Sequence, residues 1–141
     1  AEGCCPLNRS IQEGKDWYPM EENTLADSIA VGVPRNPDKA LNAIRESDGI
    51  PVNVSDEEIL SAMKTLGSAG IFAEPAGAAG TAGLKKAVGL GLIPADASVV
   101  SVVTGSGLKD VANAMKAAGE PISIEPDMAL LLEAFRNKGL K

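Results

Sequence analysis

The sequence predicts an α/β fold with a small, mostly parallel sheet, and three observations lead to that fold class. Strand-like and helix-like segments alternate along the chain, which is typical of layered α/β proteins. Residues 99–103 are valines except for Ser101, as in a parallel strand covered on both faces. The 141 residues fit a single domain, and 45% hydrophobic but only 3% aromatic residues predict an aliphatic, alanine-rich core.

Apolar residues at helical spacing, together with capping residues and glycine or proline stops, predict the helices. Asn23 is expected to cap a helix over 24–31, and Pro37 and Pro75 each suit a first helical position. Period-two alternation or β-branched runs predict the strands. The expected helices cover about 7–14, 24–31, 37–49, 55–67, 75–88, 111–119 and 126–139, and the expected strands cover 50–54, 99–103 and 121–124.

Ser55 and Glu58 have the spacing of a capping box, in which each side chain bonds the other residue's amide. The acidic run 56–58 could instead be a metal site, but capping explains it more simply. The chain has no histidine, and Cys4 and Cys5 are adjacent, so no zinc ligand set is complete. No metal ligands are predicted.

Net charge and hydropathy restrict the partners. A formal charge of −6 argues against nucleic acid and anionic membrane surfaces, which both favour an excess of lysine and arginine. The sequence has neither an apolar run long enough to span a bilayer nor a signal-peptide pattern. A cytoplasmic location without a nucleic-acid or membrane partner is therefore expected.

The turn 104–110, Thr-Gly-Ser-Gly-Leu-Lys-Asp, follows the predicted strand 99–103 and has several interpretations. It lacks the spacing of a phosphate loop, and a dinucleotide fingerprint would need a third glycine. It could let the backbone approach a flat ligand, with the Thr104 hydroxyl donating to a ring nitrogen. A tight strand–helix turn explains the residues equally well.

Glu74 precedes Pro75 at the start of a helix rich in glycine and alanine. Each interior glycine costs a helix up to about 1 kcal/mol relative to alanine, so close packing is expected to offset that cost. Glu74 is either a surface or capping carboxylate or a partly enclosed carboxylate that lines a pocket.

Taken together, several short motifs make the chain resemble the carboxyl-terminal part of enzymes of the threonine synthase family. Members of this family are fold-type II pyridoxal-phosphate enzymes. The dehydratases for threonine and serine share Glu-Pro-Ala-Gly-Ala, whereas Thr-Gly-x-Gly-Leu-Lys-Asp is more similar to threonine synthase. The motifs occur in the family's order: Ala1-Glu2-Gly3, Thr24-Leu25-Ala26-Asp27-Ser28-Ile29, Gly32-Val33-Pro34-Arg35, Val54-Ser55-Asp56-Glu57-Glu58-Ile59, Phe72-Ala73-Glu74-Pro75-Ala76-Gly77-Ala78-Ala79 and Thr104 to Asp110.

The resemblance implies a pyridoxal 5'-phosphate enzyme, a lyase that converts O-phospho-L-homoserine and water into L-threonine and phosphate. It implies a three-layer fold, in which a small, mostly parallel sheet is flanked by helices, within the large domain of the enzyme. Thr104 and Gly105 would bind the cofactor, with Thr104 bonding its pyridine nitrogen, and Glu74 would lie near the pocket. A neutral hydroxyl there leaves the ring a weaker electron sink than a carboxylate would.

The family's Schiff-base lysine, its glycine-rich phosphate loop and its substrate-phosphate residues would all lie upstream of this chain. No lysine here matches the catalytic one, Lys109 included, so no catalytic residue is assigned and residues 1–141 alone are expected to be inactive. A strand whose neighbours are missing would leave an open edge, through which a homodimer could form. The alternatives are a threonine or serine dehydratase, a paralogue that uses phosphoserine, and a small-molecule-binding or interaction module.

Overall fold

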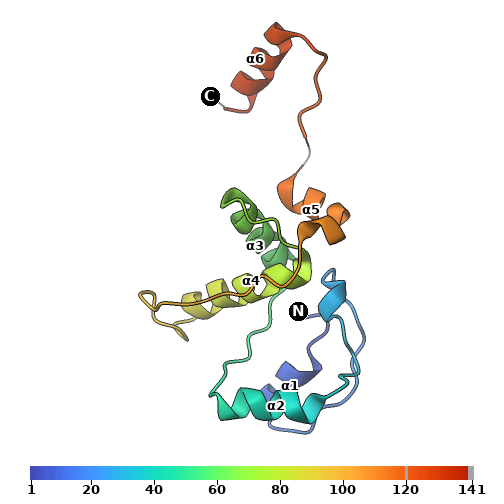
Figure 1. Cartoon of the computed structure of the whole chain (residues 1–141), viewed down its shortest axis with the longest axis vertical. Helices are drawn as coiled ribbons and strands as arrows, with labels where there is room; N and C mark the ends of the chain where they lie inside the picture. Colours follow the sequence, from blue (N-terminus) through green and yellow to red (C-terminus); the bar gives the residue numbers. More distant parts are fainter. Residues whose placement is uncertain (120, 140–141) are drawn as a thin grey trace.

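The computed structural model describes residues 1–119 and 121–139, and within these ranges the chain forms helices and no strand. Helices α3, α4 and α5 lie together in the middle of the molecule, α1 and α2 lie at one end, and α6 lies apart at the other (Figure 1). The elements in chain order are α1 (Pro6–Glu13), η1 (Asp27–Ile29), α2 (Pro37–Glu46), α3 (Asp56–Ser68), α4 (Pro75–Gly89), η2 (Gly107–Lys109), α5 (Val111–Ala118) and α6 (Met128–Asn137), of which η1 and η2 are 3-10 turns. None of the described helices is long and apolar enough to cross a membrane.

Most of the expected helices are confirmed, but the helix over 24–31 is wrong. Only the short turn η1 forms there, because the residues before it are bound to other parts of the chain. The Thr24 hydroxyl and the Leu25 amide donate to the Asp56 carboxylate, at 2.6 and 3.0 Å. The Asn23 amide donates to the Gly3 carbonyl at 3.1 Å. Contacts distant in sequence thus replace the expected helix cap.

The three expected strands are also wrong as paired strands. Residues 99–103 are extended along α4, but Val100 is 90% exposed and Val102 is 72% exposed, so this run is not covered on both faces. The reason is the lack of a neighbouring strand within the described residues, where the recorded pairing is one isolated antiparallel bridge between Ala73 and Ser106. Segments 50–54 and 121–124 are likewise extended without strand partners in the part of the chain that the structure describes.

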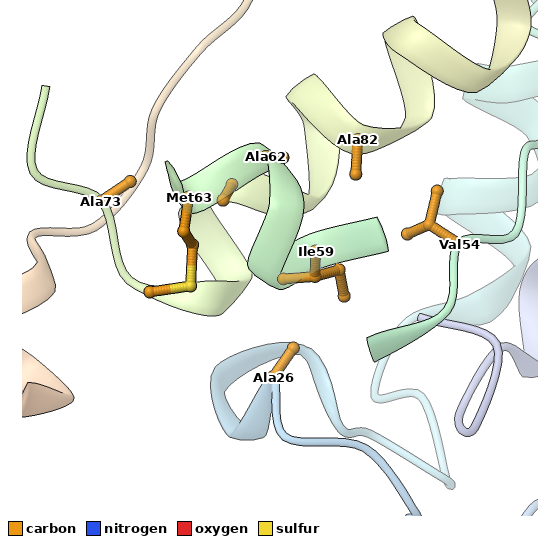
Figure 2. Packing of buried hydrophobic residues seen from close by; sticks show 8 residues of the cluster. Ala26, Val54, Ile59, Ala62, Met63, Ala73 and Ala82 are labelled. Carbon is orange, nitrogen blue, oxygen red and sulfur yellow. The ribbon is translucent and has the colours of Figure 1, made fainter. Parts of the chain in front are cut away.

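The core is aliphatic and rich in alanine, as the composition predicts. Figure 2 shows Ile59, Ala62 and Met63 of α3 gathered near Ala82 of α4, with Ala26 and Val54 completing the cluster. Alanine side chains let α3 and α4 approach closely, so dispersion contacts replace the bulk that aromatic rings would give. Helix α5 packs against α3, and the turn η2 before it contacts α5.

Close packing offsets only one of the interior glycines of α4. A Cβ atom at Gly77 would lie 2.9 Å from the carbonyl oxygen and 3.0 Å from the nitrogen of Gly105. Backbone atoms cannot move aside as a flexible side chain can, so Gly77 is required for this contact. A Cβ atom at Gly83 would have no neighbour within 4 Å, and nothing in the structure explains that glycine.

Side-chain caps fix the beginnings of α3 and α5. The expected capping box is present, since Ser55 and Glu58 each accept a hydrogen bond from the other's amide. The hydrogen bond from Lys86, followed by that from the Ser55 amide, holds the pKa of Glu58 below its usual value. At α5, Asp110 accepts from the side chain of Asn113 at 2.7 Å and from its amide at 3.0 Å, and these bonds lower the pKa of Asp110.

Replacing Gly77 and Gly83, two of the four glycines of α4, separates tight packing from helix propensity. We expect Gly77→Ala to lower the free energy of unfolding by about 1–3 kcal/mol, because the added methyl meets the Gly105 backbone. We expect Gly83→Ala to raise it by about 0.5–1 kcal/mol, because alanine favours the helix and meets nothing. Thermal and urea denaturation measure both effects, and a loss of similar size in the two variants would contradict this packing.

Removing the bond from the Asn113 side chain to Asp110 should change how stability depends on pH. A carboxyl whose pKa is lowered by folding stabilises the protein above its unfolded pKa, about 3.9 for Asp, and loses that contribution as the pH falls through the folded value. We expect Asn113→Ala to cost about 1 kcal/mol at pH 7 and clearly less at pH 3. Urea unfolding at both pH values measures this, with Asn42→Ala on the exposed face of α2 as the control. A loss that is independent of pH would contradict the assignment.

Candidate functional site

The candidate site is the junction between residues 72–77, where α4 begins, and the turn 104–107. Two backbone hydrogen bonds hold the segments together: the Glu74 amide donates to the Gly105 carbonyl, and the Gly107 amide donates to the Phe72 carbonyl, both at 3.0 Å. Ser106 caps the short turn η2 by accepting from the Leu108 amide at 3.3 Å. The two segments therefore form one structural unit, although the sequence motifs in them were interpreted separately. Glu74 and Lys109 within them are 35 residues apart in the chain.

Glu74 is a buried carboxylate whose partner is a lysine. Its side chain is only 6% exposed, and the Lys109 ammonium lies 3.0 Å from each carboxylate oxygen. Glu74 precedes the first residue of α4, yet its side chain accepts no hydrogen bond from the helix amides. Glu74 is thus neither a surface nor a capping carboxylate but an enclosed one, whereas its place in the wall of a pocket stays a prediction.

Gly105 lets this carboxylate approach the turn. A Cβ atom at Gly105 would overlap the Glu74 carboxylate, and one at Gly107 would overlap the ring of Phe72. Glu74 and Phe72 therefore explain why glycine stands at 105 and 107: their side chains fill the space that a larger residue at each position would need.

The structure brings Glu74 and Gly105 into contact and places Thr104 at the edge of the junction. The Thr104 side chain is exposed, and no group among the described residues hydrogen-bonds its hydroxyl. This hydroxyl is free to donate to a ligand. Asp110, next to Lys109, is occupied as the cap of α5.

The functional pairing that sequence reasoning missed is that of Lys109 with Glu74. No local sequence pattern predicts this ion pair, because the two residues belong to different elements that the fold brings together. The one available signal was that Glu74 lies among apolar residues, where a carboxylate needs a compensating cation. Lys109 is the basic residue of the neighbouring motif.

The acidic residues near the start of α3 have other partners. Asp56 accepts hydrogen bonds from Thr24 and Leu25, and Glu58 pairs with Lys86 at 2.9 Å. In residues 1–119 and 121–139, no three or more His, Cys, Asp or Glu side chains gather as a metal site would require. An open, mostly apolar cavity of about 370 Å³ lies between α3 and α5, and it is lined by Met63, Lys64, Gly67, Ser68, Phe72, Ala73, Ala114, Ala117 and Ala118. The predicted site residues do not line it.

Comparison with known proteins places the chain in a family. Residues 1–105 match the family described as "Pyridoxal-phosphate dependent enzyme". The curated relatives include "Threonine synthase" of Methanosarcina acetivorans, 43% identical over 98% of this chain and 35% of the relative. "Threonine synthase" of Methanocaldococcus jannaschii is 44% identical over 93% of this chain and 33% of its own length. "Threonine synthase" of Synechocystis sp. is 44% identical over 79% of this chain and 30% of its own length.

The chain therefore spans about a third of the length of these relatives. The match to the family covers the start of α4 and the predicted cofactor residues Glu74, Thr104 and Gly105. The similarity to the Methanosarcina relative continues over nearly the whole chain. The chain belongs to the pyridoxal-phosphate-dependent enzyme family.

Proposed function

We propose that this chain is the carboxyl-terminal part of a threonine synthase, a lyase that makes L-threonine and phosphate from O-phospho-L-homoserine and water. The observation that carries the proposal is the 43% identity to a threonine synthase over 98% of the chain. That similarity includes the turn and the helix start that form the junction.

The residues at the junction fit pyridoxal phosphate at the ring, and not at its phosphate. The exposed Thr104 hydroxyl, which no described group hydrogen-bonds, offers a neutral donor for a ring nitrogen, and Gly105 beside it carries no side chain that would block a flat ring. Glu74 lies beside them, but its charge is paired with Lys109. When bound, the cofactor supplies an electron sink for carbanion chemistry. In this proposal Thr104 orients the ring without protonating it, and Glu74 and Gly105 shape the wall behind it.

The lysine that binds the cofactor is proposed to lie in the part of the protein outside this chain. Lys109, the lysine at the junction, already pairs with Glu74, and Lys86, further along α4, pairs with Glu58. A nucleophilic lysine must be available to the substrate or cofactor, so neither ion-paired lysine is assigned that role. The chain would thus contribute cofactor positioning, and the rest of the protein would contribute the covalent chemistry.

We propose that the sheet of the three-layer fold forms when this chain joins the rest of the protein. The run 99–103 favours this arrangement, because exposed valines and an extended backbone without strand partners are costly in a lone chain. Val103 already packs against the core, so the run is held along α4 with one side available for pairing. In the absence of the remainder, a second copy of the chain would bind at the same edge.

Reconstitution in cells tests the proposal. We expect this chain, co-expressed with the part of the Methanosarcina acetivorans relative that it does not match, to let a bacterium lacking threonine synthase grow without threonine. Neither piece alone should do so. Val100→Lys should abolish growth, because a charge on the exposed side of 99–103 blocks strand pairing. Leu90→Lys, also at an exposed apolar position, is the control. The proposal fails if both pieces are produced and bind each other but turn over no O-phospho-L-homoserine.

Substitution of Thr104 tests the cofactor wall. In the reconstituted enzyme, Thr104→Val keeps the shape of the side chain and removes its hydroxyl. We expect kcat to fall about tenfold, since one hydrogen bond contributes about 1–1.5 kcal/mol. Thr81→Val, which removes a hydroxyl from α4 that faces Ser101 at 3.3 Å, should leave turnover unchanged. Unchanged steady-state kinetics in Thr104→Val would remove Thr104 from the site.

A further inference from the structure

We infer that Lys109 is a positioning residue: its ammonium holds the Glu74 carboxylate against the Gly105 backbone and thereby fixes the turn that presents Thr104. The inference rests on the proposed function for what the turn presents, but the contact itself is independent of it. It gives a role to a lysine that the cofactor chemistry leaves unused.

The geometry of the ion pair indicates that Lys109 sets the position of Glu74. Both carboxylate oxygens lie 3.0 Å from Nζ, so the ammonium bridges them. The Glu74 side chain is 6% exposed, whereas that of Lys109 is 61% exposed. A buried charge depends on its partner, because it has lost the water that would otherwise solvate it. The exposed lysine does not depend on the carboxylate in the same way.

The start of α4 does not explain the orientation of Glu74. A carboxylate before the first helical residue usually accepts a bond from an amide of the first turn. Glu74 makes no such bond. Its backbone amide is bonded to Gly105 and its carboxylate fills the space beside Gly105, so both ends of the residue contact the same glycine. Whatever fixes this carboxylate also fixes the backbone of the turn.

A second lysine–glutamate pair in the same chain provides a contrast. Lys86 and Glu58 are 2.9 Å apart, but both side chains are about one-third exposed or more. Exposed pairs of this kind contribute little, because water and salt screen them. Loss of Lys86 should therefore leave its surroundings in place, whereas loss of Lys109 leaves a buried carboxylate uncompensated beside the turn.

Hydrogen exchange of the full 141-residue chain tests the contact without any activity. The amides of Glu74 and Gly107 both cross the junction, so their exchange reports its opening. We expect Lys109→Met to speed exchange at these two amides on the order of tenfold, and Lys109→Arg to keep it within about twofold of the original rate. Lys86→Met is the matched control and should change neither amide. Unchanged exchange in Lys109→Met would overturn the inference.

A double-mutant cycle in the reconstituted enzyme tests the role of Lys109 in the site. We expect Lys109→Met to lower kcat about tenfold with KM within about twofold, and Lys109→Arg to restore most of the loss. If Lys109 acts through Glu74, adding Lys109→Met to Glu74→Gln should cost less than a further twofold. Effects that multiply would overturn the positioning role and make Lys109 a residue that touches substrate.

The two measurements separate this inference from the proposed function. If the original reconstituted enzyme makes no threonine, the proposed function fails, and hydrogen exchange alone decides whether Lys109 holds the turn. If the enzyme is active but Lys109→Met changes neither the hydrogen-exchange rates nor kcat, the inference fails and the proposed function stands. Weaker binding of pyridoxal phosphate by Lys109→Met, followed by fluorescence titration, would support the positioning role independently of turnover.

Discussion

The contact between the start of α4 and the turn 104–107 is the constraint on which the rest of the site depends. Gly77 meets the backbone of Gly105, and the Glu74 carboxylate occupies the space that a side chain at Gly105 would need. Neither glycine can be exchanged for a larger residue without separating the two segments. The contact therefore holds α4 and the turn together. It also connects the buried Glu74 carboxylate with the exposed Thr104 hydroxyl through the backbone of that turn.

Local rules predicted what local interactions decide. The Ser55–Glu58 capping box and the glycine that ends α1 were recoverable because the partners lie within a few residues of each other. The helix over 24–31 failed because Thr24 and Leu25 donate instead to Asp56, which is distant in sequence. The Glu74–Lys109 pair was out of reach for the same reason. At the candidate site, residue types pointed to Glu74, Thr104 and Gly105, but only the fold joins Glu74 to Gly105.

The strand over 99–103 was predicted from a valine run that is typical of a buried strand. Within the described residues, however, no strand lies beside this run, and Val100 and Val102 stay exposed. The alanine-rich core around Ile59 could be predicted from composition because its members pack on one another. Strand pairing could not be predicted in the same way, since it depends on a partner segment that the pattern of one segment does not reveal.

The exposed run also bears on how this chain behaves at high concentration. A short, uncharged, β-branched segment without a strand partner is prone to pair with copies of itself. Val100 and Val102 are 90% and 72% exposed, so residues 99–103 are the part of the described chain where self-association would begin when the protein is concentrated.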